Sequence, residues 1–284
     1  MPAFAVVLAA LSALVWGSAD YCGGRATRLA SAWAVTVRAQ LAGAVLLSVV
    51  VLIVPGTVYA SDLAWGGGAG AAGILGLVLL YQGLATGHAA VVAPVTAVTS
   101  ALVPMIFGLF SQGLPEPMPL AGAVCAVVAI GLVSVGPSAP DASRRATLVG
   151  PRLLVLALTS GALFGIFFVL LAQAHDDSGM WPLAGARACS IGVGLLFMAR
   201  LRVSLRLPHG TGAWVLVAGV GDIAANALYL LAARSGPLSV VAPVAALYPV
   251  ATVLLALVID RERVRAWQGV GLTLAAVALV LTAI

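Results

Sequence analysis

The sequence predicts an all-α integral membrane protein whose ten transmembrane helices form two inverted five-helix repeats. Of its 284 residues, 62% are hydrophobic and only 8% are charged, and the mean hydropathy is +1.15. Such a chain has too little polar surface to cover a water-soluble globule. The string Val-Val-Ala-Pro-Val occurs at 91–95 and again at 240–244. Composition therefore predicts a bilayer protein, and repetition predicts that it has two related halves.

Apolar runs separated by glycine, proline and charged residues give the number of spans, because a helix needs about 20 apolar residues to cross the hydrocarbon core. No positively charged segment precedes the first run, so we interpret it as a spanning helix and not as a cleaved signal peptide. The ten predicted spans are 3–21, 31–53, 63–85, 88–110, 118–136, 149–173, 181–200, 212–233, 237–259 and 266–283.

The repeat continues beyond the duplicated string at a nearly constant offset. Arg38 and Arg187 lie 149 residues apart, and each follows a tryptophan, Trp33 or Trp181. Ordered matches that include arginine and tryptophan are hard to obtain by chance in a chain rich in alanine, valine and glycine. The predicted units are a first repeat at 2–137, a polar linker at 138–148 and a second repeat at 149–284.

An odd number of helices in each half has a geometric consequence. The second half must enter the membrane from the opposite side, which makes the two halves an inverted pair. Exchanging the conformations of such halves converts an inward-open state into an outward-open state. The repeat thus predicts a transporter that works by alternating access.

The basic residues are unevenly distributed between the two faces. All fourteen are arginines, and most of them follow odd-numbered spans, whereas only Arg234 is near the other face. The positive-inside rule places these loops in the cytoplasm and both termini outside the cell (plasma or inner) membrane. The net charge of +5 is spread over four loops without interleaved aromatic residues, so no nucleic-acid partner is expected. The loop arginines are Arg25, Arg28, Arg144, Arg145, Arg152, Arg200, Arg202, Arg206, Arg261, Arg263 and Arg265.

Several further features stand out in the sequence: Trp-Gly-Ser-Ala-Asp-Tyr at 16–21, Arg38, Gly-Pro-Leu-Ser-Val-Val-Ala-Pro-Val at 236–244, and Asp-Arg-Glu-Arg at 260–263 before Trp-Gln-Gly. Together they resemble the ten-helix EamA-type members of the drug/metabolite transporter superfamily. The resemblance covers residues 2–284 as two EamA repeats. It implies a helical basket with a central cavity, and export or exchange of small metabolites such as amino acids. Familiar members usually keep both termini in the cytoplasm, whereas the arginines here indicate the reverse.

Asp222 is the foremost candidate for substrate binding or proton coupling, because charge inside a membrane is costly and usually functional. Asn226 and Tyr229 follow it by four and seven residues, which places all three on one helical face. This face can line a polar cavity, accept a substrate ammonium or take up a proton. The alternative is a structural role, with Asp222 linking neighbouring helices through buried hydrogen bonds.

Asp20 and Arg38 lie on consecutive predicted helices near their connection. We expect a structural ion pair, because an unpaired arginine there would be costly. Arg38 can alternatively grip a substrate carboxylate through two parallel hydrogen bonds. Arg187 has Phe168 where the repeat would place a partner equivalent to Asp20, which favours a cavity-facing position for Arg187.

Aromatic residues supply candidate cavity walls. We expect Tyr81, Tyr229 and Tyr248 to stack on an apolar or cationic substrate, and Trp33 and Trp181 to anchor helix ends at the membrane interface.

Pro94 and Pro243 occupy the duplicated string, and each removes a helical hydrogen bond. These prolines predict one helix kink in each repeat. Each kink either acts as a bending point or is a static feature that shapes the helical basket.

No motif indicates an enzyme, a metal site or a cofactor. The three cysteines are scattered, and His175-Asp176-Asp177 is predicted to be a solvated turn. Protease and esterase motifs are absent from the sequence.

The leading hypothesis is a secondary transporter of small metabolites in the lipid bilayer, as a monomer or homodimer, with protons as a candidate coupling ion carried by Asp222. A lipid-linked substrate flippase and a non-transporting membrane scaffold are the alternatives.

Overall fold

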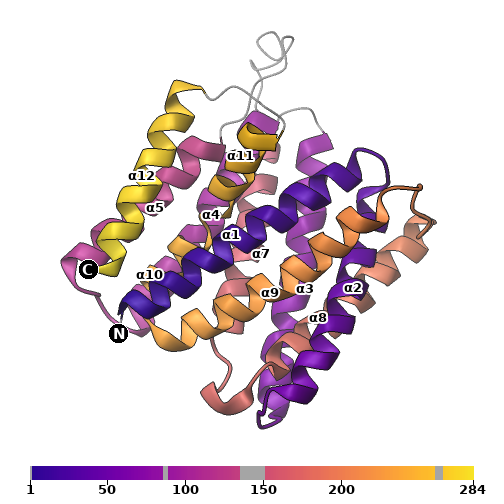
Figure 1. The fold of residues 1–284 in the computed structure, drawn as a ribbon, viewed down its shortest axis with the longest axis horizontal. Coiled ribbons are helices and arrows are strands. Elements are labelled where there is room, and N and C mark those ends of the chain that lie inside the picture. The colour runs from indigo at the N-terminus through magenta and orange to yellow at the C-terminus, as the bar shows by residue number, and fades with distance from the viewer. Residues whose placement is uncertain (1, 86–88, 135–150, 260–264) are drawn as a thin grey trace.

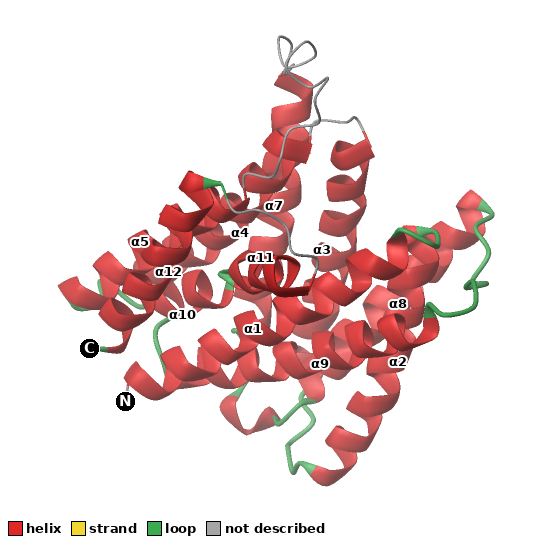
Figure 2. Cartoon of the chain, turned by 45° about the horizontal axis from the view of Figure 1, so that its top comes forward, coloured by secondary structure: helices red, strands yellow, loops and turns green. Residues whose placement is uncertain are grey.

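The computed structural model describes residues 2–85, 89–134, 151–259 and 265–284. All regular structure in these ranges is helical (Figures 1 and 2), and ten helices or helix pairs are long and apolar enough to cross a membrane. The all-α membrane fold predicted from the sequence is confirmed. The predicted linker 138–148 and Arg144, Arg145, Arg261 and Arg263 lie outside the described residues.

The observed helices follow the predicted spans closely, with one notable extension. The first helix continues six residues beyond its predicted end, to Thr27. Gly23 and Gly24 do not stop it, because a membrane helix must keep its backbone hydrogen bonds internal. The helices are α1 Pro2–Thr27, α2 Ala32–Ile53, α3 Ala60–Ala85, α4 Ala89–Ser111, α5 Pro117–Ser134, α7 Pro151–Leu171, α8 Trp181–Leu201, α9 Gly212–Ser235, α10 Leu238–Ala245, α11 Tyr248–Ile259 and α12 Ala266–Ala283, with the short 3-10 helix η2 Asp176–Ser178 before α8.

Large apolar side chains point outward from many of these helices. Leu52 in α2 is 86% exposed and Phe110 in α4 is 89% exposed. A water-soluble protein would not expose apolar surface at this density. These side chains form the surface that faces lipid.

The helices pack as a basket in which the two halves of the chain interleave. In Figure 1, α1 lies along α9, and α5 lies along α12 at one end of the molecule. At the other end α2 contacts α8 and α9, while α3 packs on α7 and α8. Most of the extensive contacts therefore join a helix of the first half to one of the second.

Glycine allows the closest of these helix approaches. A Cβ atom on Gly66 in α3 would overlap the carbonyl oxygen of Pro182 in α8, and one on Gly70 would overlap that of Ala186. Small residues at such crossings let two backbones meet. The glycine-rich segment of α3 therefore has a packing role.

Adjacent glycines of α3 provide a matched test of this packing. We expect Gly66→Ala to lower the free energy of unfolding by about 1–3 kcal/mol, as overpacking does. Gly67→Ala meets nothing within 4 Å, so it should leave stability unchanged or raise it slightly through helix propensity. Thermal unfolding of the two purified variants in detergent measures the difference, and equal melting temperatures would contradict the packing argument.

The two prolines of the duplicated string have different surroundings. Pro94 lies inside the continuous helix α4, together with Pro104. Pro243 lies near the end of α10, and the ninth span is broken between α10 and α11, after Ala245. The structure thus has a continuous helix in one half and a helix break in the other, and the pair of kinks stays a prediction.

Candidate substrate cavity

A cavity of about 540 Å³ lies between the two halves of the basket. Its wall comes from α1, α2, α3, α7, α8 and α9, with single residues from α4 and α11. Small-molecule sites typically have volumes of roughly 300–1,000 Å³. The cavity is therefore of a size that suits a metabolite.

The cavity is open toward one face of the molecule and closed toward the other. Along α1, the lining extends from Trp16 to Thr27, where Gly24 is exposed and Thr27 is half-buried. Toward its other end, α1 buries Ala5 and Ala9 in the main apolar cluster. The open side thus faces the α1–α2 connection, and the closed side is sealed by apolar packing.

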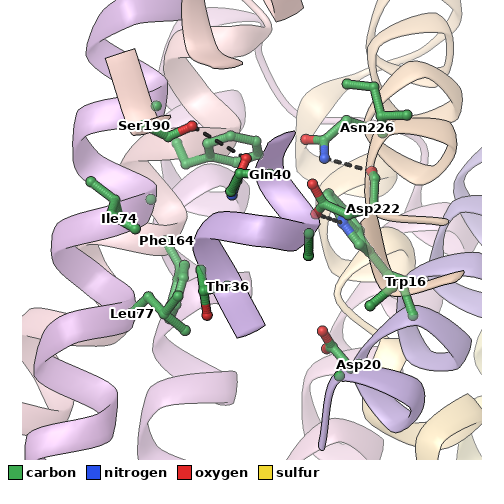
Figure 3. Close-up of a pocket in the computed structure, with 18 of the residues that line it drawn as sticks. Trp16, Asp20, Thr36, Gln40, Ile74, Leu77, Phe164, Ser190, Asp222 and Asn226 are labelled. Atoms are coloured by element: carbon green, nitrogen blue, oxygen red, sulfur yellow. Dashed lines mark hydrogen bonds between the residues drawn. The ribbon is translucent and has the colours of Figure 1, made fainter. Parts of the chain in front are cut away.

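A charged pair lies at the centre of the cavity wall. Arg187 Nη2 donates to Asp222 Oδ2 at 2.7 Å, and Arg187 Nη1 donates to Gln40 Oε1. The Trp16 indole N–H donates to Asp222 Oδ1 at 3.2 Å, and Ser190 Oγ donates to Gln40 at 3.3 Å. Figure 3 shows Gln40 and Ser190 on one side of the view and Trp16 and Asp222 on the other. Side chains from four helices thus meet at one polar centre.

Burial explains why this centre is held together. The Arg187 side chain is only 7% exposed, whereas that of Asp222 is 35% exposed and faces the cavity. A charge inside a membrane protein is costly unless it is paired and hydrogen-bonded. The pair neutralises both charges, and Asp222 keeps a surface that a ligand can reach.

Three of the predicted site residues besides Asp222 lie on the cavity wall. Arg187 and Tyr248 line it, and so does Asn226, whose amide donates to the backbone carbonyl of Asp222 at 2.7 Å. Their roles in binding or proton coupling stay predictions. The side chain of Tyr81 lies outside the described residues.

Tyr229 does not lie on the cavity wall, although it shares a helical face with Asp222. Its side chain is fully buried, and its hydroxyl donates to the Phe168 carbonyl at 2.9 Å. Its ring packs against Phe168 at 4.7 Å and against Trp16 at 6.1 Å. Tyr229 therefore packs behind the residues that line the cavity, and its buried, hydrogen-bonded hydroxyl is not available to a ligand.

The expected ion pair between Asp20 and Arg38 is not formed. Arg38 is exposed, and its Nε donates to the Leu205 carbonyl at 2.9 Å, which ties α2 to the α8–α9 connection. Asp20 instead lines the cavity and is exposed there (Figure 3). Because α1 continues seven residues past Asp20, the carboxylate is roughly 10 Å along the axis from the helix end. Arg38 is not part of the cavity lining.

Several lining residues were not anticipated. Gln40, Ser190 and Thr36 contribute polar atoms, and Phe164 and Phe167 contribute aromatic surface. The repeat contains a signal for one of them, since Phe164 follows Trp16 by 148 residues. Gln40 could have been found as a polar residue within an apolar span.

A second polar cluster lies on the closed side, between α3, the α7–α8 connection and the end of α9. Asp62 is fully buried and accepts hydrogen bonds from the backbone N–H of His175, at 3.1 Å, and from its ring Nδ1, at 2.8 Å. Asp177 accepts a hydrogen bond from the Tyr59 hydroxyl at 2.7 Å, which raises the pKa of Tyr59.

Arg234 in α9 completes this cluster. It donates hydrogen bonds to the carbonyls of Gly179 and His175 and to Ser178 Oγ. We call Tyr59, Asp62, His175, Asp177, Ser178 and Arg234 the polar latch.

The latch differs from the solvated turn predicted at His175-Asp176-Asp177. The His175 side chain is 54% exposed, so part of the turn does face solvent. Its contacts with Asp62 and Arg234, however, join it to two helices that are distant in sequence. Tertiary contacts therefore order this turn.

Comparison with known proteins agrees with this fold. Residues 152–284 match the family described as "EamA-like transporter family". One solved structure, described only as "Crystal structure of protein", superposes with a TM-score of 0.76 at 16% identity, covering 98% of this chain and 95% of that chain. Among curated proteins, none matches the chain in sequence. Residues 152–284 therefore match an EamA-like transporter family, and the family resemblance predicted from the sequence is confirmed for this part of the chain.

Proposed function

We propose that this protein is a secondary transporter that exports or exchanges small metabolites by alternating access through the central cavity. The observation that carries the proposal is a polar site on the wall of a cavity in a membrane basket, open toward one face and sealed toward the other. A transporter needs such a site to be reachable from one side at a time.

Hydrogen bonds between the halves support the inverted repeat on which this mechanism depends. Ser12 Oγ in α1 donates to the Ala225 carbonyl in α9 at 2.8 Å. Ser160 Oγ in α7 donates to the Gly76 carbonyl in α3 at 2.7 Å. The two donors are 148 residues apart in sequence, and the two acceptors are 149 apart. One contact thus repeats with the halves exchanged, in keeping with units at 2–137 and 149–284.

Helix packing at the end of the basket repeats in the same way. A Cβ on Gly122 in α5 would collide with Thr282 in α12, and a Cβ on Gly271 in α12 would collide with Val133 in α5. Gly122 and Gly271 are 149 residues apart, and so are Val133 and Thr282. These reciprocal contacts fit two copies of one fold related by a pseudo-twofold axis.

The fourth and ninth spans supply the asymmetry that distinguishes an inward-open from an outward-open state. The ninth span is broken after Ala245, whereas α4 is continuous through the equivalent region. We propose that the break moves to α4 when the cavity opens to the other side. Pro94 and Pro243 lower the cost of a break at these depths, because neither supplies a helical N–H.

The proposed orientation follows from charge. The cavity opens toward connections that carry Arg28, Arg202 and Arg206, which the positive-inside rule places in the cytoplasm. The state described is then inward-open, with the polar latch sealing the outer side and both termini outside.

Counterflow in proteoliposomes tests the proposed function. Purified protein in vesicles preloaded with one metabolite of a broad panel should accumulate the labelled metabolite from outside, without ATP. We expect at least one cargo to accumulate above protein-free vesicles. If no member of a panel of cationic, anionic, zwitterionic and neutral metabolites accumulates, the transport proposal is wrong and a scaffold role gains support.

A further inference from the structure

The charges of the cavity do not cancel. Among the described lining residues, only Asp20, Arg187 and Asp222 carry charge. Arg187 and Asp222 neutralise each other at 2.7 Å. Asp20 forms no ion pair and no hydrogen bond with any described residue, and no dashed line reaches it in Figure 3. The wall therefore presents one unpaired carboxylate.

The cavity offers an anion no comparable partner. Arg187 is its only described basic residue, and that side chain is 7% exposed and already engaged by Gln40 and Asp222. A carboxylate or phosphate on a ligand would have to displace Asp222 from Arg187. Removing one partner of a buried ion pair is costly, because the other charge is left uncompensated.

Aromatic rings surround the same space. Trp16 lies 6.5 Å from Tyr248 and 6.5 Å from Phe167, measured between ring centroids, and all three line the cavity with Phe164. The faces of such rings attract cations as well as apolar groups. Trp16 and Asp20 are four residues apart in α1, so an aromatic ring and a carboxylate share one helical face.

From this arrangement we infer that the cavity binds an organic cation, an amine or quaternary ammonium that carries an apolar or aromatic group, with Asp20 as its ionic partner. This inference rests on the transport function proposed above and names the class of its substrate. The carboxylate compensates the charge of the ligand, and the rings surround its apolar part. The cost of an unpaired carboxylate within a membrane protein is offset when the cation is bound.

Equilibrium binding to the purified protein in detergent tests the inference without requiring transport. The probes are radiolabelled benzyltrimethylammonium and two competitors of similar size, the neutral neopentylbenzene and the anionic 3-phenylpropanoate. We expect saturable binding of the cation that neither competitor displaces. Asp20→Asn should weaken it by about tenfold or more, the effect of losing about 1.4 kcal/mol or more. Asp20→Glu should retain most of the affinity, and Glu116→Gln, which removes an exposed carboxylate outside this cavity, should retain all of it.

The outcomes separate this inference from the transport proposal. Because Asp20→Asn removes an unpaired charge, its melting temperature should be no lower than that of the parent protein. Unfolding would then not account for weaker binding. Parental affinity in Asp20→Asn, or preferential binding of the anion, would overturn the inference even if the protein transports another cargo. Cation binding through Asp20 without any counterflow would uphold the site and reject transport.

Discussion

Replacing Arg187 with methionine is expected to lower the free energy of unfolding by about 1–3 kcal/mol and to abolish transport. The physical reason is the ion pair with Asp222, in which Arg187 is only 7% exposed. Removing Arg187 leaves the Asp222 carboxylate, which is 35% exposed to the cavity, without its charged partner and also removes the hydrogen bond to Gln40. Thermal unfolding in detergent and counterflow in proteoliposomes measure the two effects separately.

The double variant Arg187→Met/Asp222→Met distinguishes a structural pair from a functional one. Replacing both members of a buried ion pair with apolar residues of similar size is often neutral or stabilising, so most of the lost stability should return. Transport should not return, because the polar centre of the cavity is gone. A double variant that transports like the parent would assign the pair to structure alone.

Arg38→Met is the matched control, since Arg38 and Arg187 are related by the repeat. Arg38 is exposed and bonds a loop carbonyl outside the cavity. Surface substitutions usually change stability by less than about 0.5 kcal/mol. We therefore expect nearly parental stability and transport, and a loss as large as that of Arg187→Met would contradict the assignment of the two arginines.

The helices were predictable from the sequence because lipid imposes a simple rule on length and polarity. A span at 31–53 was expected, and α2 runs from Ala32 to Ile53. Local breaks were less predictable. Gly23-Gly24 looks like a helix end but continues α1, whereas the ninth span breaks after Ala245, where α10 packs against α4 and α1.

Helical periodicity predicted the face of α9 that contributes to the site but not the depth of the cavity. Asp222 and Asn226 line the cavity, whereas Tyr229 lies beneath it against Phe168. Spacing along one helix places side chains on a common stripe. The position of the opposing helix, here α7, determines where the cavity ends. The spacing of residues along α9 does not predict that position.

Pairing of charges across the fold was the least predictable feature. Proximity in sequence suggested that Asp20 would pair with Arg38, but Arg38 bonds Leu205 and Asp20 faces the cavity. The partner of Arg187 proved to be Asp222, 35 residues along the chain on α9. Interleaving of the two halves determines these neighbours, and no single helix carries that information.

The proposed alternating access requires the polar latch to open, because the closed side of the cavity would have to open once in each transport cycle. Tyr59 and Asp177 approach each other there, with the hydroxyl and carboxylate 2.7 Å apart. We expect a covalent link between these positions to prevent the closed side from opening. Transport should then stop although the cavity and its polar centre are intact.

The decisive measurement is counterflow by the double variant Tyr59→Cys/Asp177→Cys, before and after treatment with a short reducible thiol cross-linker. The variant is made in a background from which the native Cys22, Cys125 and Cys189 have been removed. Each single variant and a Ser204→Cys/Arg206→Cys pair within the α8–α9 connection serve as controls. Transport is predicted to fall to the level of empty vesicles on cross-linking of the latch and to recover on reduction, with the controls unchanged. Undiminished transport through a latch shown by mass spectrometry to be fully cross-linked would contradict alternating access.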